Sequence, residues 1–403
     1  MINPYFIYIL AFSGVSIAYL FGWSSLFPTI KLPLIIFLVL SMVGAFILGL
    51  ILKKKKIIVF QKLEYNANMT LITLGILFGY LLEGFYNKGF PLLSMLLKMD
   101  SNYTEFGIPM FHVFLVTFNS FFALYLFQVL LSISNKKLIG FLFVLNLVPS
   151  LLIVNRGMLV IIMMGCLSIF LIKYQKEITV KLMLFIISFL VIAAFLFGVS
   201  GNMRVNNSYQ TGKPFYDNDK FLSIGGATSD FKNSPIPKEF FWTYIYGASP
   251  LANLQHTIDK VEFDEDIDGK STSMFIVTQL LPDFISKRIV GIYGYEVPEH
   301  FQITPELNVG TGFILAYVIL GWPGIFLFTI VLFGFAFFYI VLLKNLNSRF
   351  FIVGIAILNS LFLMNTFANM ISFTGLSLQL IYPIFFSILD NTLEKNNKKR
   401  FLI

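Results

Sequence analysis

The sequence is poor in the residues that soluble enzymes depend on. Charged residues make up only 12% of the 403 residues and hydrophobic residues make up 57%, which is far from the averages of soluble domains. The single cysteine, Cys166, excludes an internal disulfide bond. No Walker or dinucleotide-binding glycine motif, no CxxC or HExxH pattern and no internal repeat occurs. We therefore expect neither a cofactor nor a metal site.

Long runs without charge are abundant instead. About 20 apolar residues cross a bilayer, and flanking lysines extend somewhat shorter helices. The last run, 350–389, has a polar middle and predicts two spans. The run 307–343 is interrupted by a Gly-Trp-Pro-Gly sequence at 321–324, which predicts a short outer helix that leads into one span. The sequence thus predicts an all-α polytopic membrane protein with about ten transmembrane helices, and eleven is the alternative, from the runs 1–30, 32–52, 65–82, 106–135, 138–155, 157–172, 182–203, 307–343 and 350–389.

Lysine and arginine placement predicts the orientation. Under the ten-span interpretation the cytoplasmic pieces hold 16 of these residues and the short outer connections hold four, as the positive-inside rule requires. Both termini are then cytoplasmic, and the polar segment 201–306 is a large extracytoplasmic loop. The net charge of +8 is therefore an orientation signal, and we expect no nucleic-acid partner. The first span lacks a basic n-region and a cleavage site, so we expect it to be retained.

This orientation divides the chain into three parts. Residues 1–200 are expected to hold transmembrane helices 1–7. Residues 201–306 form the large loop, which contains 14 of the 21 acidic residues and two of the three histidines. Residues 307–403 are expected to hold helices 8–10 and a cytoplasmic tail. Within the loop, 238–258 and 273–290 have the pattern of amphipathic helices that lie on the membrane or cap a cavity.

Two arginines are expected at the same outer membrane surface. Arg156 lies in the tight Asn155-Arg156-Gly157 turn between two spans, and Arg204 follows another outward span. Guanidinium groups bind phosphate through two parallel hydrogen bonds, so the pair favours a diphosphate ligand. The alternative for either residue is an arginine that extends to the lipid headgroups.

Other polar residues near the outer surface are weaker candidates. Glu83 is the only acid within a predicted span, and intramembrane ionisable residues are functional candidates; its expected partner is Arg156 or Arg204. A short interfacial helix is predicted at 92–99. His112 begins the next span, either as a packed helix residue or as a general base. Residues 264–269 imitate the start of a calcium loop but lack its closing glutamate, which favours a solvated acidic turn.

Several of these segments together resemble the Wzy-type oligosaccharide repeat-unit polymerases of O-antigen, capsular and exopolysaccharide assembly. The resemblance covers most of the chain by its architecture. It lies in 89–93 followed by Phe-Gly-Ile-Pro at 106–109, in the Asn155-Arg156-Gly157 turn, in Arg204 after a span, and in 308–312 leading into 320–324.

The resemblance implies a metal-independent glycosyltransferase of GT-C-like helical architecture in the bacterial cytoplasmic (inner) membrane. Such enzymes join undecaprenyl-diphosphate-linked oligosaccharides at the outer face, by transfer to the non-reducing end of a new lipid-linked repeat. Membrane lipids, a flippase and a chain-length regulator are the implied partners. The outer arginines of the family match Arg156 and Arg204. A glycan ligase of the same superfamily and a lipid-linked-oligosaccharide flippase or transporter are the alternatives.

The chemistry of such a transfer assigns expected roles to these residues. Arg156 and Arg204 would bind the diphosphate and stabilise the leaving group. His256 and His300 are the first candidates for the general base and His112 is the next. The loop would serve as a lid and sugar-holding wall over the site. The expected substrate-binding residues are Arg156, Arg204, His112, Glu83, Trp242, Tyr244 and Asn308.

Overall fold

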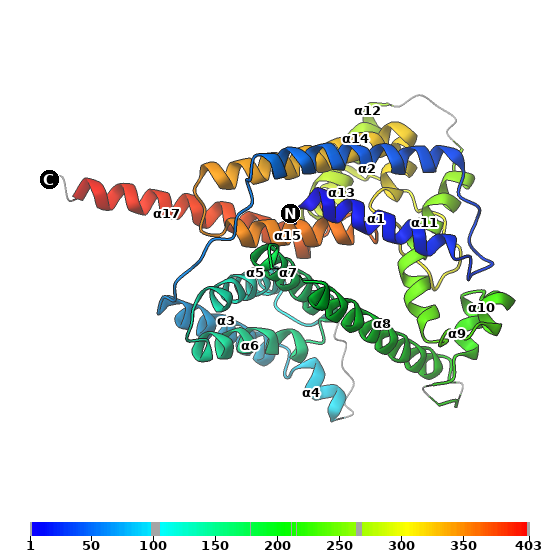
Figure 1. Cartoon of the computed structure of the whole chain (residues 1–403), viewed down its shortest axis with the longest axis horizontal. Coiled ribbons are helices and arrows are strands. Elements are labelled where there is room, and N and C mark those ends of the chain that lie inside the picture. Colours follow the sequence, from blue (N-terminus) through cyan, green and yellow to red (C-terminus); the bar gives the residue numbers. More distant parts are fainter. Residues whose placement is uncertain are drawn as a thin grey trace.

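Helices form nearly all the regular structure in the computed structural model of the chain (Figure 1). The structure describes residues 2–97, 105–177, 179–210, 212–214, 216–262 and 268–400. Within these ranges no β-strand occurs, and Ser24 and Ala227 form an isolated β-bridge. The predicted all-α class is confirmed for this part of the chain.

Within the described ranges, seven segments are long and apolar enough to span a membrane, and three apolar helices are shorter. Every apolar run predicted from the sequence overlaps one of them, and 350–389 overlaps two. This pattern is that of a multi-pass helical membrane protein; the number of spans and their orientation stay predictions. The long segments are α2 (Leu32–Lys54), α3 (Asn68–Tyr86), α5 (Phe111–Ser132), α7 (Arg156–Tyr174), α8 (Val180–Ser208), α14 (Ile314–Asn345) and Thr374–Leu393, which comprises α16 (Thr374–Ser377), η3 (Leu378–Leu380) and the start of α17 (Ile381–Arg400); the shorter helices are α1 (Pro4–Leu20), α6 (Lys137–Leu152) and α15 (Phe351–Met364).

The centre of the bundle is α15, whose residues Phe351–Phe362 are all buried. It packs against α1, α5, α7 and α14. Within this apolar core the amide of Asn359 donates a hydrogen bond to Ser168 Oγ of α7 at 2.5 Å. A polar group in an apolar interior needs such a partner, so this bond ties the central helix to the part of the bundle that carries Arg156.

Gly321 bends α14. It has φ +62 and ψ −147 inside an otherwise helical stretch, and Pro323 follows it. Only glycine adopts this backbone region readily, and proline removes a helical hydrogen bond. The predicted interruption is confirmed: a short helix from Ile314 leads into the long one.

Shorter helices follow α8 and cover one end of the bundle. Figure 1 shows α9 and α10 at the end opposite to the one from which α17 projects. The helices in this region differ from the expected segments at two places. The boundary at 201 falls inside α8, which continues to Ser208, and the second amphipathic helix is divided by Pro282. The elements here are α9 (Asp219–Ile224), α10 (Ser229–Asn233), α11 (Phe240–Lys260), α12 (Gly269–Phe275), the π-helical turn η2 (Ile276–Leu280) and α13 (Asp283–Tyr293).

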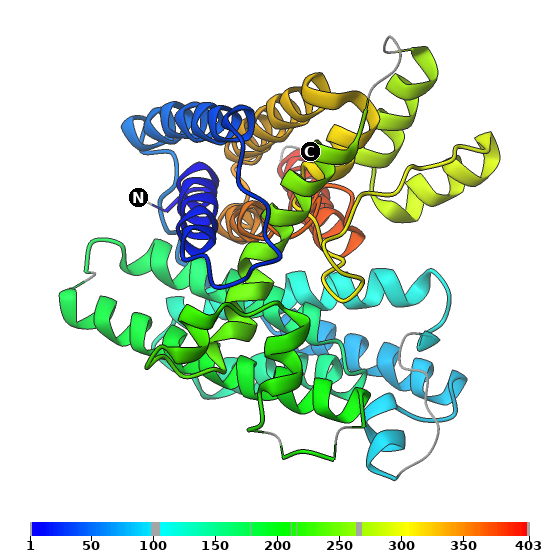
Figure 2. The ribbon, with the colours of Figure 1, turned by 90° about the vertical axis from the view of Figure 1, so that its right-hand side faces the viewer.

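The helix α11 is an integral part of the bundle. It packs against α1, α8 and α14, and most of its residues are buried. Thr243 Oγ1 donates a hydrogen bond to the Ala194 carbonyl of α8 at 2.8 Å. Of the two expected positions for this helix, on a membrane surface or over a cavity, the packing favours the second, because Trp242 and Tyr246 line a cavity. Figure 2 shows it crossing between the α1 and α2 side of the molecule and the side that holds α8.

Candidate functional site

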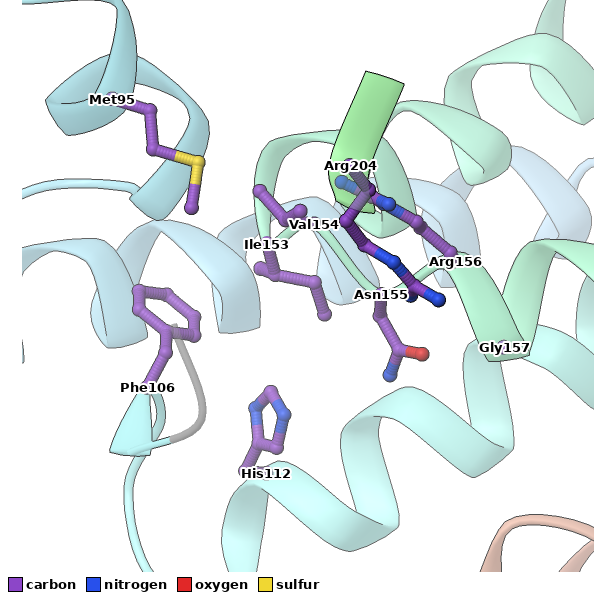
Figure 3. A pocket seen from close by; sticks show the side chains of 9 residues that line it. All are labelled: Met95, Phe106, His112, Ile153, Val154, Asn155, Arg156, Gly157 and Arg204. Carbon is purple, nitrogen blue, oxygen red and sulfur yellow. The ribbon is translucent and has the colours of Figure 1, made fainter. Parts of the chain in front are cut away.

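One cavity brings together three of the predicted site residues, Arg156, Arg204 and His112. It has a volume of about 620 Å³. Figure 3 shows the two arginine side chains on one side of the cavity and the His112 ring on the other. A group bound in the middle would therefore contact both kinds of side chain. The lining residues are Met95, Phe106, His112, Ile153, Val154, Asn155, Arg156, Gly157 and Arg204.

His112 is paired with a buried carboxylate. Its Nδ1 lies 2.9 Å from Oε2 of Glu83, and the Glu83 side chain has no exposed surface. The other carboxylate oxygen accepts a hydrogen bond from the Ile108 backbone N–H at 3.3 Å. Since Nδ1 is engaged by Glu83, Nε2 is the ring nitrogen of His112 that remains for a bound group. The expectation that an arginine partners Glu83 is wrong, because His112 is the closer group.

Glycines permit this pairing by allowing α3 and α5 to approach closely. A methyl group on Gly79 would lie 2.9 Å from Leu115 Cδ1, and one on Gly107 would lie 2.4 Å from His112 Cγ. Gly107 has φ +114, a conformation that favours glycine. Met110, directly before α5, has φ +65. The turn that delivers His112 is thus held in uncommon backbone conformations, as is frequent at functional sites.

A second unusual turn delivers Arg156. Val154 has φ +57, which is strained for a β-branched residue. Asn155 then caps α7, because its Oδ1 accepts a hydrogen bond from the Met158 backbone N–H at 3.0 Å. The first turn of α7, with Arg156 and Gly157, lines the cavity.

The short interfacial helix predicted at 92–99 corresponds to α4 (Pro91–Leu96) and contributes Met95 to the cavity wall. Residues 98–99 lie outside the described residues.

Arg204 is held in place by α11. Its Nη2 donates a hydrogen bond to the Tyr246 hydroxyl at 2.6 Å. The guanidinium carbon also lies 5.1 Å from the ring centre of Trp242, a cation–π contact. Trp242 in turn stacks on Tyr246, with ring centres 5.1 Å apart. Because Arg204 projects from the last turns of α8 and is fixed by another helix, its position depends on the packing of α8 against α11.

The electrostatics of the cavity favour an anion. Two exposed guanidinium groups line it, and the positive end of the α7 dipole points toward it. Among the described residues that line it there is no acid, and Glu83 is buried against His112. The arrangement can therefore bind a phosphate or diphosphate between the arginines and offer an imidazole nitrogen to a neighbouring hydroxyl.

The structure does not bring the other two histidines to this cavity. His300 Nε2 lies 3.3 Å from the Asn308 backbone carbonyl, and burial lowers the pKa of His300. His256 packs its ring edge-on against Phe301, with ring centres 6.5 Å apart. Neither histidine nor Asn308 lines the cavity with the arginines. The order of the base candidates predicted from the sequence is thus corrected in favour of His112, the histidine beside the arginines.

The two aromatic residues expected to bind sugar are buried. Tyr244 packs on Trp23 and Phe27, and its hydroxyl accepts the Trp23 backbone N–H at 3.2 Å. It belongs to the core between α1 and α11. Trp242 is 3% exposed and lies beneath Arg204. Direct stacking of sugar on Tyr244 is therefore ruled out by packing, whereas Trp242 supports an arginine of the site.

Metal ligands do not gather in the described part of the chain. Among those residues no group of three or more His, Cys, Asp or Glu side chains could hold an ion. The sequence that imitates a calcium loop lies largely outside the described residues; its described acid, Asp268, caps α12 by accepting the Ser271 backbone N–H at 2.6 Å.

Comparison of the chain with protein-family models, with curated proteins and with solved structures finds no match. The functional assignment therefore depends on the residues of the cavity.

Proposed function

We propose that the chain is a membrane glycosyltransferase that polymerises oligosaccharide repeat units from a polyprenyl-diphosphate carrier. One observation carries the proposal: Arg156, Arg204 and His112 line a single cavity, and His112 is paired with the buried Glu83. These are the groups that transfer of a glycan from a diphosphate requires, namely cations for the leaving group and a base for the attacking hydroxyl. The family resemblance and the predicted outer position of the cavity support the same function.

The reaction follows from the positions of these groups. His112 Nε2 takes the proton of an acceptor hydroxyl while Glu83 holds Nδ1–H and stabilises the imidazolium that forms. The hydroxyl oxygen bonds to the anomeric carbon of the donor, and the bond from that carbon to the diphosphate oxygen breaks. The lipid diphosphate leaves with one more negative charge, which Arg156, Arg204 and the first turn of α7 stabilise. Removal of one such donor typically costs roughly a hundredfold or more in rate.

A ladder assay tests the proposal. Purified protein in nanodiscs is given a lipid-linked repeat unit, and products are separated by length. Arg156→Ala and His112→Ala should each abolish the ladder, and Arg156→Lys should restore it poorly, because lysine lacks the planar fork. Arg288→Ala is the matched control, since Arg288 is exposed on α13 and does not line the cavity.

Three outcomes would replace the proposal. Full-length polymer from Arg156→Ala or His112→Ala would remove these residues from the chemistry. Transfer of the glycan only to a different class of acceptor would make the protein a ligase. Movement of labelled lipid-linked glycan across the wall of a proteoliposome, without lengthening, would make it a flippase.

A further inference from the structure

A second cavity shares Arg204 with the first. Its volume is about 340 Å³, within the roughly 300–1,000 Å³ that is common for ligand sites. Four segments build it: the end of α8, α9, α11 and the loop before α14. Arg204 lines both cavities. The two cavities are therefore neighbours that share one cationic side chain.

Aromatic rings and a carboxylate form the walls of this second cavity. Tyr209, Trp242 and Tyr246 contribute rings, and Phe221 adds a fourth beneath Trp242, with ring centres 4.1 Å apart. Glu306 is exposed in the wall, where its Oε1 accepts a hydrogen bond from the Tyr209 hydroxyl at 2.9 Å. Backbone N–H donation within Glu306 and this hydroxyl lower the pKa of the carboxyl. Glu306 is thus a charged acceptor at neutral pH.

These walls match the chemistry of a neutral sugar ring. A pyranose has apolar C–H faces that pack on aromatic rings and hydroxyl groups that donate to a carboxylate. Hydrogen bonds to charged acceptors are the stronger ones. A free anion would be repelled by Glu306, and a hydrocarbon tail would displace water from the charged groups of Glu306 and Arg204 without offering them hydrogen bonds in return, at a cost in free energy. Neither alternative uses all the groups present.

We propose that the second cavity binds a neutral pyranose of the donor glycan, next to the diphosphate held by Arg156 and Arg204. The assignment to the donor rests on the proposed function. The acceptor hydroxyl must reach His112, which lines only the first cavity. We therefore assign a sugar in the second cavity to the donor, whose diphosphate is held by the shared Arg204 and whose anomeric carbon must lie where the two cavities meet, within reach of that hydroxyl.

A comparison of two ligands isolates the sugar contribution. The probes are polyprenyl diphosphate without sugar and polyprenyl diphosphate carrying one neutral hexose. Binding is followed by the fluorescence of Trp242, which lies against Arg204, in a Trp23→Phe, Trp322→Phe background that removes the other two tryptophans. Glu306→Gln should weaken binding of the hexose probe about tenfold or more, because a charged hydrogen bond is lost, and should leave the sugar-free probe unchanged. Tyr209→Phe should act in the same direction.

Control variants separate this site from the first cavity. Glu299→Gln changes an exposed acid of the same region that does not line the cavity and should alter neither probe. Arg156→Ala should weaken both probes equally. An equal effect of Glu306→Gln on both probes, or none on either, would overturn the sugar site.

The ladder assay keeps the two proposals distinguishable. If Glu306→Gln selectively loses binding of the hexose probe and the unsubstituted protein forms no polymer, the sugar site is retained and the polymerase function is rejected. Normal polymer with unchanged hexose binding in Glu306→Gln would retain the polymerase and reject the sugar site.

Discussion

The Nδ1 atom of His112 lies 2.9 Å from Oε2 of Glu83, although 29 residues separate the two in the sequence. The carboxylate is fully buried and the ring is partly exposed to the cavity. A buried polar group needs hydrogen-bond partners, and His112 and the Ile108 N–H are the partners of Glu83. In the proposed reaction this pair sets the tautomer and orientation of the base, and Glu83 is a positioning residue.

We expect Glu83→Gln to lower kcat of polymerisation by about tenfold to a hundredfold. Loss of a carboxylate that orients a metal-bound histidine through the second ring nitrogen has an effect of this size. KM for the lipid-linked repeat should stay unchanged, because Glu83 does not line the cavity. Steady-state kinetics on the purified variant measure both constants. A rise in KM at constant kcat would contradict the positioning role. Glu105→Gln, an exposed acid on the preceding loop, is the control.

Gly107→Ala should inactivate the protein without preventing its assembly. A methyl group at this position would lie 2.4 Å from His112 Cγ, and the backbone φ of +114 disfavours any side chain. The imidazole must then move away from Glu83. The expected result is loss of polymer with a normal elution volume on size-exclusion chromatography. Gly291→Ala, where nothing lies within 4 Å of the new methyl group, should retain activity.

The bend in α14 supplies a test of stability. Gly321→Ala places a side chain in a backbone region that is nearly exclusive to glycine, at a cost of roughly 1–3 kcal/mol. The melting temperature in detergent should fall. Gly334→Ala in the same helix has open space for its methyl group and should leave the melting temperature unchanged or slightly higher. Equal melting temperatures for the two variants would show that the bend is not strained for alanine.

His300 is expected to make the loop before α14 sensitive to acid. Burial lowers the pKa of His300 in the folded chain below the ordinary value of 6.5. The unfolded chain therefore binds more protons as pH falls through that value, and the local structure loses stability on the acid side and regains it above. Hydrogen exchange of amides 300–309, corrected for intrinsic rates, should be faster at pH 5 than at pH 7.5.

His300→Gln removes the titrating group and keeps an N–H donor for the Asn308 carbonyl. The acid-dependent part of the exchange should then disappear. His256→Gln is the control and should leave the acid dependence in place, since His256 contacts a different partner. Persistence of the full effect in His300→Gln would assign it to another group.

The helices could be predicted from local composition because bilayer-spanning segments are apolar along their whole length. The same was true of the bend at Gly321 and Pro323, whose causes are backbone effects of the two residues themselves. Arg156 and Arg204 could be expected at the same membrane surface because each lies at the end of a predicted span, and the structure brings both to one cavity. The base could not be chosen in this way. His256 and His300 lie in the polar loop, but tertiary packing directs them away from the arginines.

The sequence by itself determined that the chain is a helical membrane protein and that Arg156 and Arg204 are candidates for anion binding. Only the tertiary structure decided which histidine and which acids accompany them. The Glu83–His112 contact depends on how α3 and α5 are rotated against each other, which small residues such as Gly79 set through contacts across the interface. The second cavity depends likewise on the docking of α11 against α8. Both relationships join residues far apart in the chain, and local composition carries no information about such pairs.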